Sequence, residues 1–457
     1  NINGKAMAQT IYEYDKNGDV TKIVSPEGYQ TLMRYDGSDR IVQLTKCCKT
    51  GIERTTTFEY DKAGNLVKEV DCNGNAINYD YDSMNRRIRI KDKEDGITRL
   101  FYDKSGNIIK HITPQNYIPE KDNGKGTIFL YDNMNRLVEV WNALGNAVEK
   151  NRYNPSGELI ERTDALQRSI EYTYDIGGRI KRIITPGAKQ IGSSGQEYTY
   201  DALGNITGIK DGEDNFTHYT LDLWGRITEI TKADGSSEKY GYDYAGNVIY
   251  STDGNGNTTE YAYNSLNLLS SIKDPVGGMI TYKYDMQGRL VKYTDRNQRT
   301  IEYLYNLDNN IVQRKEITTG TREEYRYNTD GSLQAAVSGG YTFSYLYTPN
   351  MNLKRKSINN KTVLEYKYDK NSKIVELNDF TGRQTNYKYD ILGRVEEVWD
   401  SRSKTASYEY NIDDTISSIH WENGTRVKYG YDDDKNISEI SAINNEGIEL
   451  LKHIYAY

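Results

Sequence analysis

Apolar and polar positions follow one short pattern from one end of the chain to the other. Residues 282–306 read YKYDMQGRLVKYTDRNQRTIEYLYN, in which Tyr-x-Tyr followed by Asp or Asn appears twice, 21 residues apart. Tyrosines at alternate positions, such as Tyr282 and Tyr284, are typical of one face of a β-strand. The segment therefore predicts a strand that recurs with a period of about 21 residues.

The tyrosine pair leads directly into Asp-x-x-Gly, as in Asp285 to Gly288. A type I turn favours Asp or Asn at its first position and Gly at its fourth, where the backbone turns left-handed into the next strand. The fourth position is Gly in eleven copies and Asn in four, the residue types that tolerate a positive φ. An aliphatic residue such as Leu290 then starts a second strand, and a second turn signal such as Asp71 to Gly74 follows. Each copy therefore predicts strand, turn, strand, turn.

Twenty copies of this unit follow one another, with Leu221 in the place of the tyrosine in one of them. No shift in composition marks a domain boundary. We therefore expect residues 1–457 to form a single array of about twenty copies of about 21 residues, with both ends truncated or inside a repeat. The structural positions of the repeat are its tyrosines, turn aspartates and turn glycines, among them Tyr14, Asp15, Tyr60, Asp61, Gly64, Tyr81, Tyr102, Gly106, Tyr174, Tyr200, Gly204, Tyr242, Gly246, Tyr284, Gly288, Tyr389 and Gly393.

About forty short antiparallel strands in a continuous meander restrict the architecture. At about 4.8 Å per strand they would unroll to a ribbon roughly 190 Å long and about 20 to 25 Å tall. Open sheets rarely exceed about ten strands, so the ribbon must curl. Bent once round, it would have a diameter near ~60 Å, which side chains cannot fill. We expect an all-β fold in which a closed or spiralling hairpin ribbon forms a hollow shell or part of one.

Two other all-β folds compete with the ribbon. Two copies supply four strands, about one β-propeller blade, but twenty copies would need about ten blades or two propellers, and alternate copies look alike. A carbohydrate-binding β-solenoid also uses hairpins of about 20 residues. Such repeats rely on Trp and Tyr-Tyr clusters, and this chain has 4 Trp. Both folds stay open as alternatives.

The tyrosine content of the chain decides whether it is expected to fold or to be disordered. A hydrophobic fraction of 36% and a net charge of −7 lean toward disorder, but the chain contains 42 Tyr and only 6 Phe. A tyrosine ring buries a large apolar area while its hydroxyl keeps a polar partner. We expect the rings to pack in ladders along the wall and the hydroxyls to reach water or a turn carboxylate.

The net charge and the lengths of the apolar segments argue against binding to nucleic acid and against a membrane span. The excess of Asp and Glu (66) over Lys and Arg (59) disfavours nucleic acid, whose binding depends on neutralising phosphates. No apolar run approaches the roughly 20 residues of a membrane span. The chain begins NINGKAMAQT, without an initiator Met or the apolar core of a signal peptide, and it ends inside a repeat. We interpret it as the middle of a longer protein.

Three cysteines are too few for a disulfide framework. Cys47 and Cys72 occupy equivalent positions in adjacent copies, two strands apart, which predicts a separation of about 10 Å. This exceeds the roughly 7 Å limit between the Cα atoms of a disulfide, so we expect free thiols. The pattern does not constrain Cys48.

The strings YDKAGNLVKEV, YDALGNITGIKD, YDMQGRLVKYTD and YDILGRVEEVWD resemble RHS/YD repeats, and the resemblance spans roughly residues 12–445. The family includes bacterial Rhs and wall-associated polymorphic toxins, the B and C components of Tc toxin complexes, and the teneurins. The resemblance implies a spiralling β-strand shell in a secreted or cell-surface protein. In the bacterial toxins the shell encloses a C-terminal toxic domain, and in teneurins it is part of an adhesion protein.

One family feature is missing. Bacterial RHS cores often end in a segment with Asp-Pro-x-Gly, where aspartates of the shell cut the toxin free. Here Asp274 to Gly277 is such a string, but it lies mid-chain, in register with the second turns of neighbouring copies. We interpret it as a turn with Pro at its second position and expect no self-cleavage.

No pattern of catalytic or metal-binding residues stands out. The 4 His are scattered, and the repeat offers its aspartates the same environment, whereas an acid–base pair needs unlike ones. Strings such as Asp253 to Asn257 lack the sixth-position Gly and the terminal Glu of a calcium loop. We expect no enzymatic activity, no metal and no cofactor. Arg or Asn recurs just after the first turn, as in Arg289 and Asn65, and we expect Arg–Asp and Arg–Tyr packing between copies and not stacking on nucleic acid.

Three copies are longer than the rest. The extra residues, four after Tyr35, eight after Tyr102 and five after Tyr174, all fall around the second turn, so the segments should project from one rim of the ribbon. Loops gathered on one face of a repeat array often mark a contact surface. The longest segment, residues 113–126, carries three residues that form our candidate contact rim: Pro114, Tyr117 and Pro119.

Two functions fit these features. In the first, the chain is the structural shell of an RHS-type secreted or cell-surface protein and encloses or presents a C-terminal toxin domain that lies beyond this chain. Its partners would then be that toxin or neighbouring domains of a longer chain. In the second, it is an adhesion or recognition module that binds a glycan or a cell-surface protein through its Tyr-rich surface and rim loops. A variable domain after the repeats would favour the first function, and a membrane anchor the second.

Overall fold

The computed structural model describes residues 9–26, 28–47, 53–306, 308–401 and 403–456. Its helices are a five-residue α-helix, α1 (Pro186–Gln190), and a three-residue 3-10 helix, η1 (Pro119–Lys121). The first strands are β1 (Ile11–Tyr14), β2 (Val20–Val24), β3 (Gln30–Tyr35), β4 (Ile41–Cys47), β5 (Glu53–Tyr60), β6 (Leu66–Val70), β7 (Ala76–Tyr81), β8 (Arg87–Lys91), β9 (Ile97–Tyr102), β10 (Ile108–Ile112), β11 (Tyr117–Ile118), β12 (Asn123–Gly124), β13 (Thr127–Tyr131), β14 (Leu137–Trp141), β15 (Ala147–Tyr153), β16 (Leu159–Asp164), β17 (Ser169–Tyr174), β18 (Ile180–Ile184), β19 (Gln196–Tyr200), β20 (Ile206–Lys210), β21 (Phe216–Leu221) and β22 (Ile227–Thr231). The remaining strands are β23 (Ser237–Tyr242), β24 (Val248–Thr252), β25 (Thr258–Tyr263), β26 (Leu269–Lys273), β27 (Met279–Tyr284), β28 (Leu290–Thr294), β29 (Thr300–Tyr305), β30 (Ile311–Glu316), β31 (Arg322–Tyr327), β32 (Leu333–Ser338), β33 (Tyr341–Tyr347), β34 (Leu353–Ile358), β35 (Lys361–Tyr368), β36 (Ile374–Asp379), β37 (Gln384–Tyr389), β38 (Val395–Asp400), β39 (Lys404–Tyr410), β40 (Ile416–Trp421), β41 (Arg426–Tyr431), β42 (Ile437–Ile443) and β43 (Glu449–Ile454).

The strands form a meander in which each strand pairs antiparallel with the next one along the chain, as β27, β28 and β29 do. β10 pairs instead with β13, because the segment between them forms a separate two-stranded hairpin of β11 and β12. One sheet therefore contains 41 strands. The predicted ribbon of about forty strands is confirmed, whereas a propeller would have divided these strands into separate four-stranded blades.

Each repeat tyrosine leads into a tight turn that we name the YD turn, and the other turn of each copy is the second turn. In the YD turn at Asp285, the backbone N–H of Gly288 donates to the Asp285 carbonyl (3.1 Å). The Asp285 carboxylate accepts from the backbone N–H groups of Gln287 (2.9 Å) and Arg289 (3.0 Å). The fourth position of the YD turn has a positive φ in all twenty copies, including those without Gly or Asn there: Asp39, Met351, Ser372, Asp414 and Lys435. The fold therefore imposes this turn even where the residue disfavours it.

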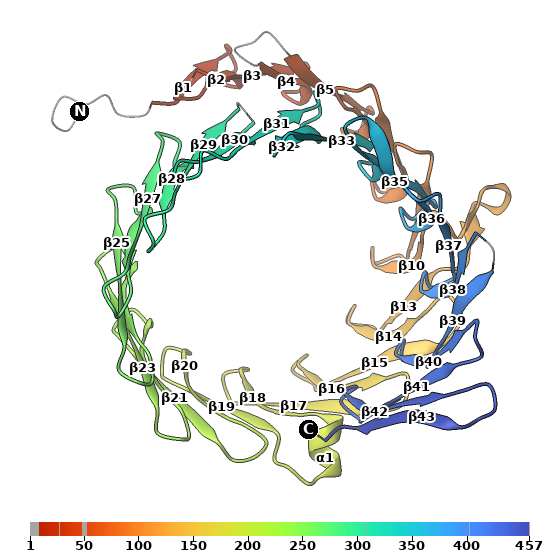
Figure 1. Cartoon of the computed structure of the whole chain (residues 1–457). Coiled ribbons are helices and arrows are strands. Elements are labelled where there is room, and N and C mark those ends of the chain that lie inside the picture. The colour runs from red at the N-terminus through yellow and green to blue at the C-terminus, as the bar shows by residue number, and fades with distance from the viewer. Residues whose placement is uncertain (1–8, 27, 48–52, 307, 402, 457) are drawn as a thin grey trace.

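The ribbon winds into a spiral (Figure 1). It passes from β1 through β10, β16 and β23 around a ring, and β31 to β43 then run beside the first part of the chain. Turns that face one another across this overlap lie 245 to 258 residues apart, and 23 ribbon strands, such as β17 to β39, separate them. At about 4.8 Å per strand, one round is roughly 110 Å long and roughly 35 Å across. Of the two expected forms, closed or spiralling, the ribbon takes the spiralling one, and because it overlaps itself its diameter is smaller than the ~60 Å of a single bend.

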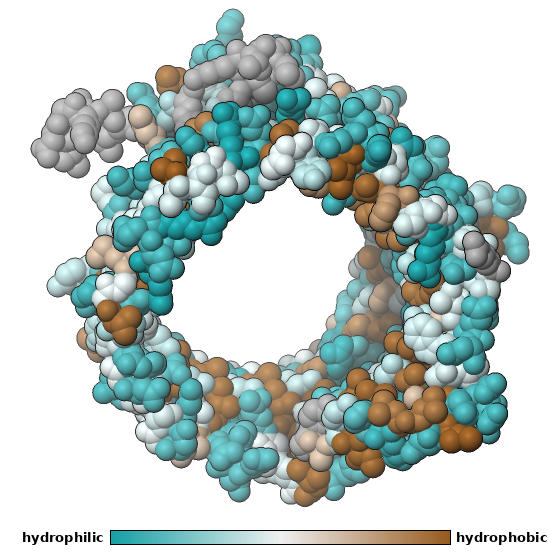
Figure 2. Space-filling view, viewed as in Figure 1, coloured by the Kyte–Doolittle hydropathy of each residue, from teal (hydrophilic) through white to brown (hydrophobic). Residues whose placement is uncertain are grey.

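The middle of the spiral is open, and the wall is one sheet thick (Figure 2). Most strand residues are half-buried, as expected for a single layer with both faces wetted. The buried apolar side chains in the described ranges are Ile112, Ile301, Ala335 and Ala406. The predicted hollow shell is confirmed, and its stability must come from contacts along the wall because its centre holds no side chains.

Candidate functional site

Neighbouring copies are joined by a contact that recurs along the ribbon. Arg289, directly after its YD turn, binds the Asp285 carboxylate through Nε and Nη2 (2.7 Å each). Its Nη1 donates to the backbone carbonyl of Asn306 in the next YD turn (3.1 Å), and its guanidinium lies 4.8 Å from the ring centre of Tyr305. The same stacking joins Arg40, Arg86, Arg136, Arg179, Arg226 and Arg394 to tyrosines one copy on. The predicted Arg–Asp and Arg–Tyr packing between copies is therefore present.

Asparagine takes the place of arginine in other copies. Asn65 Nδ2 donates to Asp61 of its own YD turn (2.9 Å) and to Asn85 of the next one (2.9 Å). The hydrogen bond from Asn65 lowers the pKa of Asp61, and backbone donors add to it. The YD aspartates thus act as ionised acceptors that hold the turn and link it to its neighbour.

The repeat tyrosine reaches back to the preceding copy. The Tyr305 hydroxyl donates to the carbonyl of Leu290 (2.7 Å), the first residue of β28. Pairing of β28 with β29 begins only at Lys292, so the hydroxyl satisfies a carbonyl outside that ladder. The same bond to the preceding copy is made by Tyr35, Tyr60, Tyr81, Tyr102, Tyr131, Tyr153, Tyr174, Tyr200, Tyr242, Tyr263, Tyr284, Tyr327, Tyr368, Tyr389, Tyr410 and Tyr431.

These bonds explain why the chain uses Tyr and not Phe. The expectation that the hydroxyls of the repeat tyrosines reach water or a turn carboxylate was wrong, because their acceptor is a backbone carbonyl. Burial raises the pKa of Tyr305, as it does for most of these phenols, which keeps them protonated donors.

Where the spiral overlaps itself, second turns of the first round contact YD turns of the second round, and we name this line of contacts the seam. Its contacts are polar and follow one another around the ring. They join Arg54 to Asp308 (2.7 Å), Asn73 to Asp330 (2.6 Å), Asn116 to the carbonyl of Ile391 (2.9 Å), Arg168 to Asp413, and Thr185 to Asp434 (2.7 Å). The seam closes the side wall along the overlap.

The seam is most densely charged around Arg168. Its guanidinium pairs with Asp164 of its own second turn (2.6 Å) and with Asp413 of the facing YD turn. Lys435 Nζ lies 3.8 Å from Asp164 and 3.9 Å from Asp413, whose side chain is only 1% exposed. Burial works to raise the pKa of Asp413, but hydrogen bonds from Thr415 and Arg168 outweigh it and lower that pKa.

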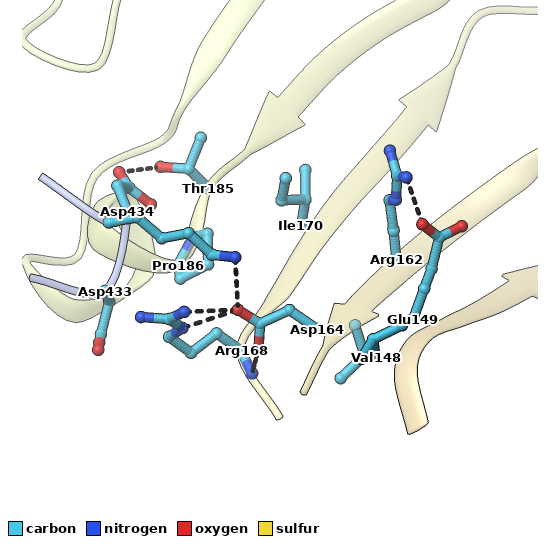
Figure 3. Close-up of a pocket in the computed structure, with 12 residues that line it drawn as sticks. Val148, Glu149, Arg162, Asp164, Arg168, Ile170, Thr185, Pro186, Asp433 and Asp434 are labelled. Atoms are coloured by element: carbon cyan, nitrogen blue, oxygen red, sulfur yellow. Dashed lines mark hydrogen bonds and ion pairs between the residues drawn. The ribbon is translucent and has the colours of Figure 1, made fainter. Parts of the chain in front are cut away.

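Figure 3 shows the cavity beside this cluster, with Arg168 and Asp164 facing one another and Thr185 facing Asp434 across the seam. Asp434 also accepts from the backbone N–H of Gly187 in α1 (2.9 Å). Apart from Asp433, every charged group drawn there has a hydrogen-bond or ion-pair partner in the chain, so the cavity is a gap between two rounds of ribbon. It is not a built ligand site.

The insertion after β10 contributes to the seam through its first residues. The backbone N–H of Gln115 donates to Asn371 (3.0 Å), and Asn116 Nδ2 donates to the carbonyl of Ile391 (2.9 Å). Thr113 Oγ1 accepts from Asn371 (3.4 Å). The insertion thus binds two successive YD turns of the second round.

The rest of this insertion folds back on the wall around Asp122. The Asp122 carboxylate accepts from Arg89 (2.7 Å), Arg99 (3.1 Å) and the Tyr117 hydroxyl (2.7 Å). Burial works to raise the pKa of Asp122, but the hydrogen bonds from Arg89, Tyr117 and Arg99 outweigh it and lower the pKa to about 2. The segment is therefore clamped to β8 and β9.

The insertions that follow β10 and β18 lie at the second-turn rim, as predicted, and the predicted insertion after β4 includes residues 48–52, which lie outside the described residues. Their seam partners are other parts of the same chain, which the sequence pattern did not reveal. Within the candidate contact rim, Tyr117 binds Asp122, Pro119 starts η1 and Pro114 precedes β11. Contact between these three residues and a partner stays a prediction.

Ser418, His420 and Glu409 form a serine–histidine–carboxylate cluster on β39 and β40. Ser418 Oγ donates to Glu409 (2.6 Å), and His420 Nε2 lies 3.1 Å from Ser418 Oγ and 3.4 Å from Glu409. In a catalytic triad the histidine contacts the nucleophile and the acid through different ring nitrogens. Here Nε2 faces both, and the serine is buried. The cluster therefore reads as a structural network between β39 and β40.

Other candidate positions have plain structural roles. Asp274 forms a second turn in which its carbonyl accepts from Gly277 (3.0 Å) and its carboxylate from Gly278 (2.7 Å), so its interpretation as a turn is confirmed. Among the described residues, no group of three or more His, Cys, Asp or Glu is placed to hold a metal ion. Within the same residues, no helix is long and apolar enough to span a membrane.

The structure describes two of the three cysteines, Cys47 and Cys72, for which the spacing predicts no disulfide. Cys72 is a free cysteine, as predicted, and burial raises the pKa of its thiol. Cys47 ends β4 with its sulfur 3.9 Å from Glu53 Oε1. Cys48 lies outside the described residues.

The sequence matches a family model described as the teneurin YD-shell over residues 1–147 and 152–320, which is more than two thirds of the chain. No curated protein matches the chain.

Solved structures share the fold. The crystal structure of TcdB2-TccC3 is 13% identical with a TM-score of 0.61, and the alignment covers 97% of this chain and 27% of that one. A Tc holotoxin pore from Photorhabdus luminescens is 13% identical with a TM-score of 0.60, over 97% of this chain and 26% of that one. The crystal structure of TcdB2-TccC3 without its hypervariable C-terminal region is 13% identical with a TM-score of 0.61, and the alignment covers 98% of this chain and 31% of that one. The chain thus spans less than a third of each of these structures. From the family match and the spiral of YD turns, the chain belongs to the teneurin YD-shell family.

Proposed function

We propose that this shell is a container whose payload is a toxic domain of the same longer protein, and that the protein is secreted or lies at the cell surface. The observation that carries the proposal is the seam, which closes the side wall of a hollow spiral. The similar solved structures support the payload, since one is named for lacking a hypervariable C-terminal region.

Containment would work by size. The strand midlines lie roughly 35 Å apart across the ring, and side chains extend about 5 Å from a sheet, so the free width is roughly 25 Å. A globular protease of about 220 residues has a radius of gyration near ~17 Å and is therefore wider than this opening. A payload inside the wall would be out of reach of such an enzyme, and no catalytic residue of the shell is needed.

The test uses the longest natural form of the protein and limited proteolysis. The region after the shell should survive at a protease concentration that digests the same region expressed alone. A variant with a broken seam, Arg168→Met, should lose part of that protection. Equal digestion rates for the free and the shell-linked region would refute the container role.

A further inference from the structure

Two elements that lie on the wall identify its outward face. Arg89 and Arg99 hold Asp122 of the insertion, and Lys189 of α1 pairs with Glu171 (2.8 Å). In Figure 1 both the insertion hairpin, orange at the right, and α1 lie outside the ring. Arg89, Arg99 and Glu171 therefore point outward. Residues that pair with them across strands, or follow them by two positions along a strand, share this face.

The outward face carries cross-strand ion pairs near the YD turns. The residue before the repeat tyrosine faces the residue eight positions after that tyrosine, and six copies place opposite charges there. These pairs are Glu13–Lys22, Glu59–Lys68, Asp80–Arg89, Arg152–Glu161, Lys367–Glu376 and Lys388–Glu397. Such paired charges suit a face in contact with water.

Two successive copies place apolar side chains at this position. Phe101, two residues after the outward-facing Arg99, pairs with Lys110, which in turn pairs with Ile128. Ile128 pairs with Trp141, and Ile128 and Leu130 are 38% and 42% exposed. These registers place four apolar residues together on the outward faces of β9, β13 and β14, and we name them the wall patch: Phe101, Ile128, Leu130 and Trp141. An exposed apolar cluster within a charged face marks an interaction surface.

The neighbouring position on β10 shows how such a surface is covered. Ile112, two residues after Lys110, is fully buried, because the insertion lies on it. A Cβ atom at Gly124 or Gly126 would lie 3.2 or 2.9 Å from Ile112, so the insertion packs its backbone directly against this side chain. The wall patch continues this contact surface beyond the insertion. Successive rounds of ribbon meet rim to rim, as the seam shows, so a further round would not cover the outward face.

The charge at the centre of the wall patch indicates what would bind there. Lys110 Nζ donates to the neutral amide of Asn123 (2.9 Å) and lies 5.8 Å from the ring centre of Phe101. No carboxylate of the described residues forms an ion pair with it, whereas Glu139 beside it already pairs with Lys150 (3.3 Å). A molecule that covers the patch must satisfy this ammonium group, and a carboxylate does so most strongly. A symmetric contact with a second copy would instead bring two such ammonium groups together.

The size of the wall patch restricts the partner further. Four strands span roughly 20 Å, and three residues along a strand span roughly 10 Å. This footprint is much smaller than an interface between folded proteins, but its length matches about six residues of extended peptide. The partner should therefore contribute a short segment and not a whole domain surface.

We propose that the wall patch binds a short peptide segment of a partner protein. In this contact a carboxylate of the segment pairs with Lys110, and adjacent aliphatic or aromatic side chains cover Ile128 and Leu130. The contact lies on the outside of the wall and does not depend on what the shell contains.

Random dodecapeptides displayed on phage and selected on the immobilised chain supply the probe. The selected peptides are synthesised with a fluorophore, and fluorescence anisotropy measures their affinities for the chain and its variants. One variant, Ile128→Ser with Leu130→Ser, removes apolar surface, and the other, Lys110→Gln, removes the ammonium group. A matched control, Leu304→Ser with Leu346→Ser, changes two exposed leucines at the position before the repeat tyrosine in other copies. Far-ultraviolet circular dichroism checks that each variant is folded.

The selected peptides should share an acidic residue beside aliphatic or aromatic ones. Their affinity should fall about tenfold or more when Ile128 and Leu130 are both replaced by serine, because apolar burial is lost. It should fall about three- to five-fold in Lys110→Gln and stay unchanged in the control. Replacing the acidic residue of the peptide by its amide should remove the effect of Lys110→Gln.

Three results would overturn the proposal. The first is that no sequence is enriched on the unmodified chain, and the second is that the variant with both serines binds the peptides at full affinity. The third is a concentration-dependent dimer of the unmodified chain that the same variant abolishes, since a second copy would then cover the wall patch.

Discussion

Replacing Arg168 by methionine removes the cation at the most buried point of the seam and keeps much of the apolar stem. Arg168 pairs with Asp164 and Asp413, and its Nη1 approaches the carbonyl of Asp432 (3.4 Å). Without it, the Asp413 carboxylate, 1% exposed, loses its main counter-charge. The two rounds of ribbon should then separate more easily at this place while each round keeps its own strand pairing.

The size of the effect follows from burial. Removing one partner of a buried ion pair costs about 3 to 5 kcal/mol, because the other charge stays buried and unpaired. Thr415 still donates to Asp413 (2.7 Å) and Lys435 lies within 3.9 Å of it, so we expect a smaller cost than this, about 2 to 3 kcal/mol. This corresponds to roughly 30- to 150-fold faster local opening.

Hydrogen exchange followed by mass spectrometry measures that opening. Peptides that cover the YD turns at 411–414 and 432–435 should exchange faster by this factor, and peptides from β20 to β25 should not change. Arg152→Met is the control, because Arg152 pairs with Glu161 (2.7 Å) within one hairpin and is 66% exposed. Adding Asp413→Asn to Arg168→Met should recover part of the loss. Unchanged exchange at both YD turns would refute the reasoning that ion pairs hold the seam.

Three further predictions concern the repeat and the insertion. Tyr305→Phe removes the hydroxyl that donates to the preceding copy and should destabilise the local structure by about 1 kcal/mol. Hydrogen exchange in β28 should then be roughly five-fold faster. Tyr244→Phe, which changes an exposed side chain, should leave the exchange rate unchanged. Gly246→Ala puts a side chain at a φ of 91° and should cost about 1 to 2 kcal/mol, measured as a lower midpoint in urea; an unchanged midpoint would contradict the left-handed turn. The clamp on Asp122 has a depressed pKa of about 2, so its contribution is complete above the ordinary carboxyl pKa of about 3.9 and is lost as the pH falls toward 2. Residues 117–124 should therefore become sensitive to an acid-active protease between these pH values while the wall stays protected.

The sequence predicts what depends on local chemistry. The alternating tyrosines and the Asp-x-x-Gly turns determine the hairpins, because both act within one copy. Even the copies with Met351 or Lys435 at the fourth position adopt the same turn, since the strands on either side are already fixed by pairing. The place of the insertions at one rim also follows from counting residues within a copy.

The sequence does not predict contacts between distant turns, because these depend on the twist and coil added up over many copies. Which second turn meets which YD turn depends on the 23 strands of one round, and that number results from the twist and coil added at every strand pair. Arg168 and Asp413 lie 245 residues apart, and neither sits in a motif that points to the other. The tyrosine acceptor was missed for a related reason, because the carbonyl of Leu290 is left outside the ladder only by the bulge at the YD turn.

The most direct test of the hollow spiral measures two distances between spin labels, in a chain whose native cysteines have been replaced. Glu94 and Lys370 line one hollow at the overlap, so labels at Glu94→Cys and Lys370→Cys should lie close together, whereas an extended ribbon would separate them by roughly 120 Å. Labels at Glu94→Cys and Ala233→Cys, half a round apart, should lie roughly 35 Å apart across the open centre. A long first distance would contradict the spiral, and a second distance near the ~10 Å of packed sheets would contradict the hollow.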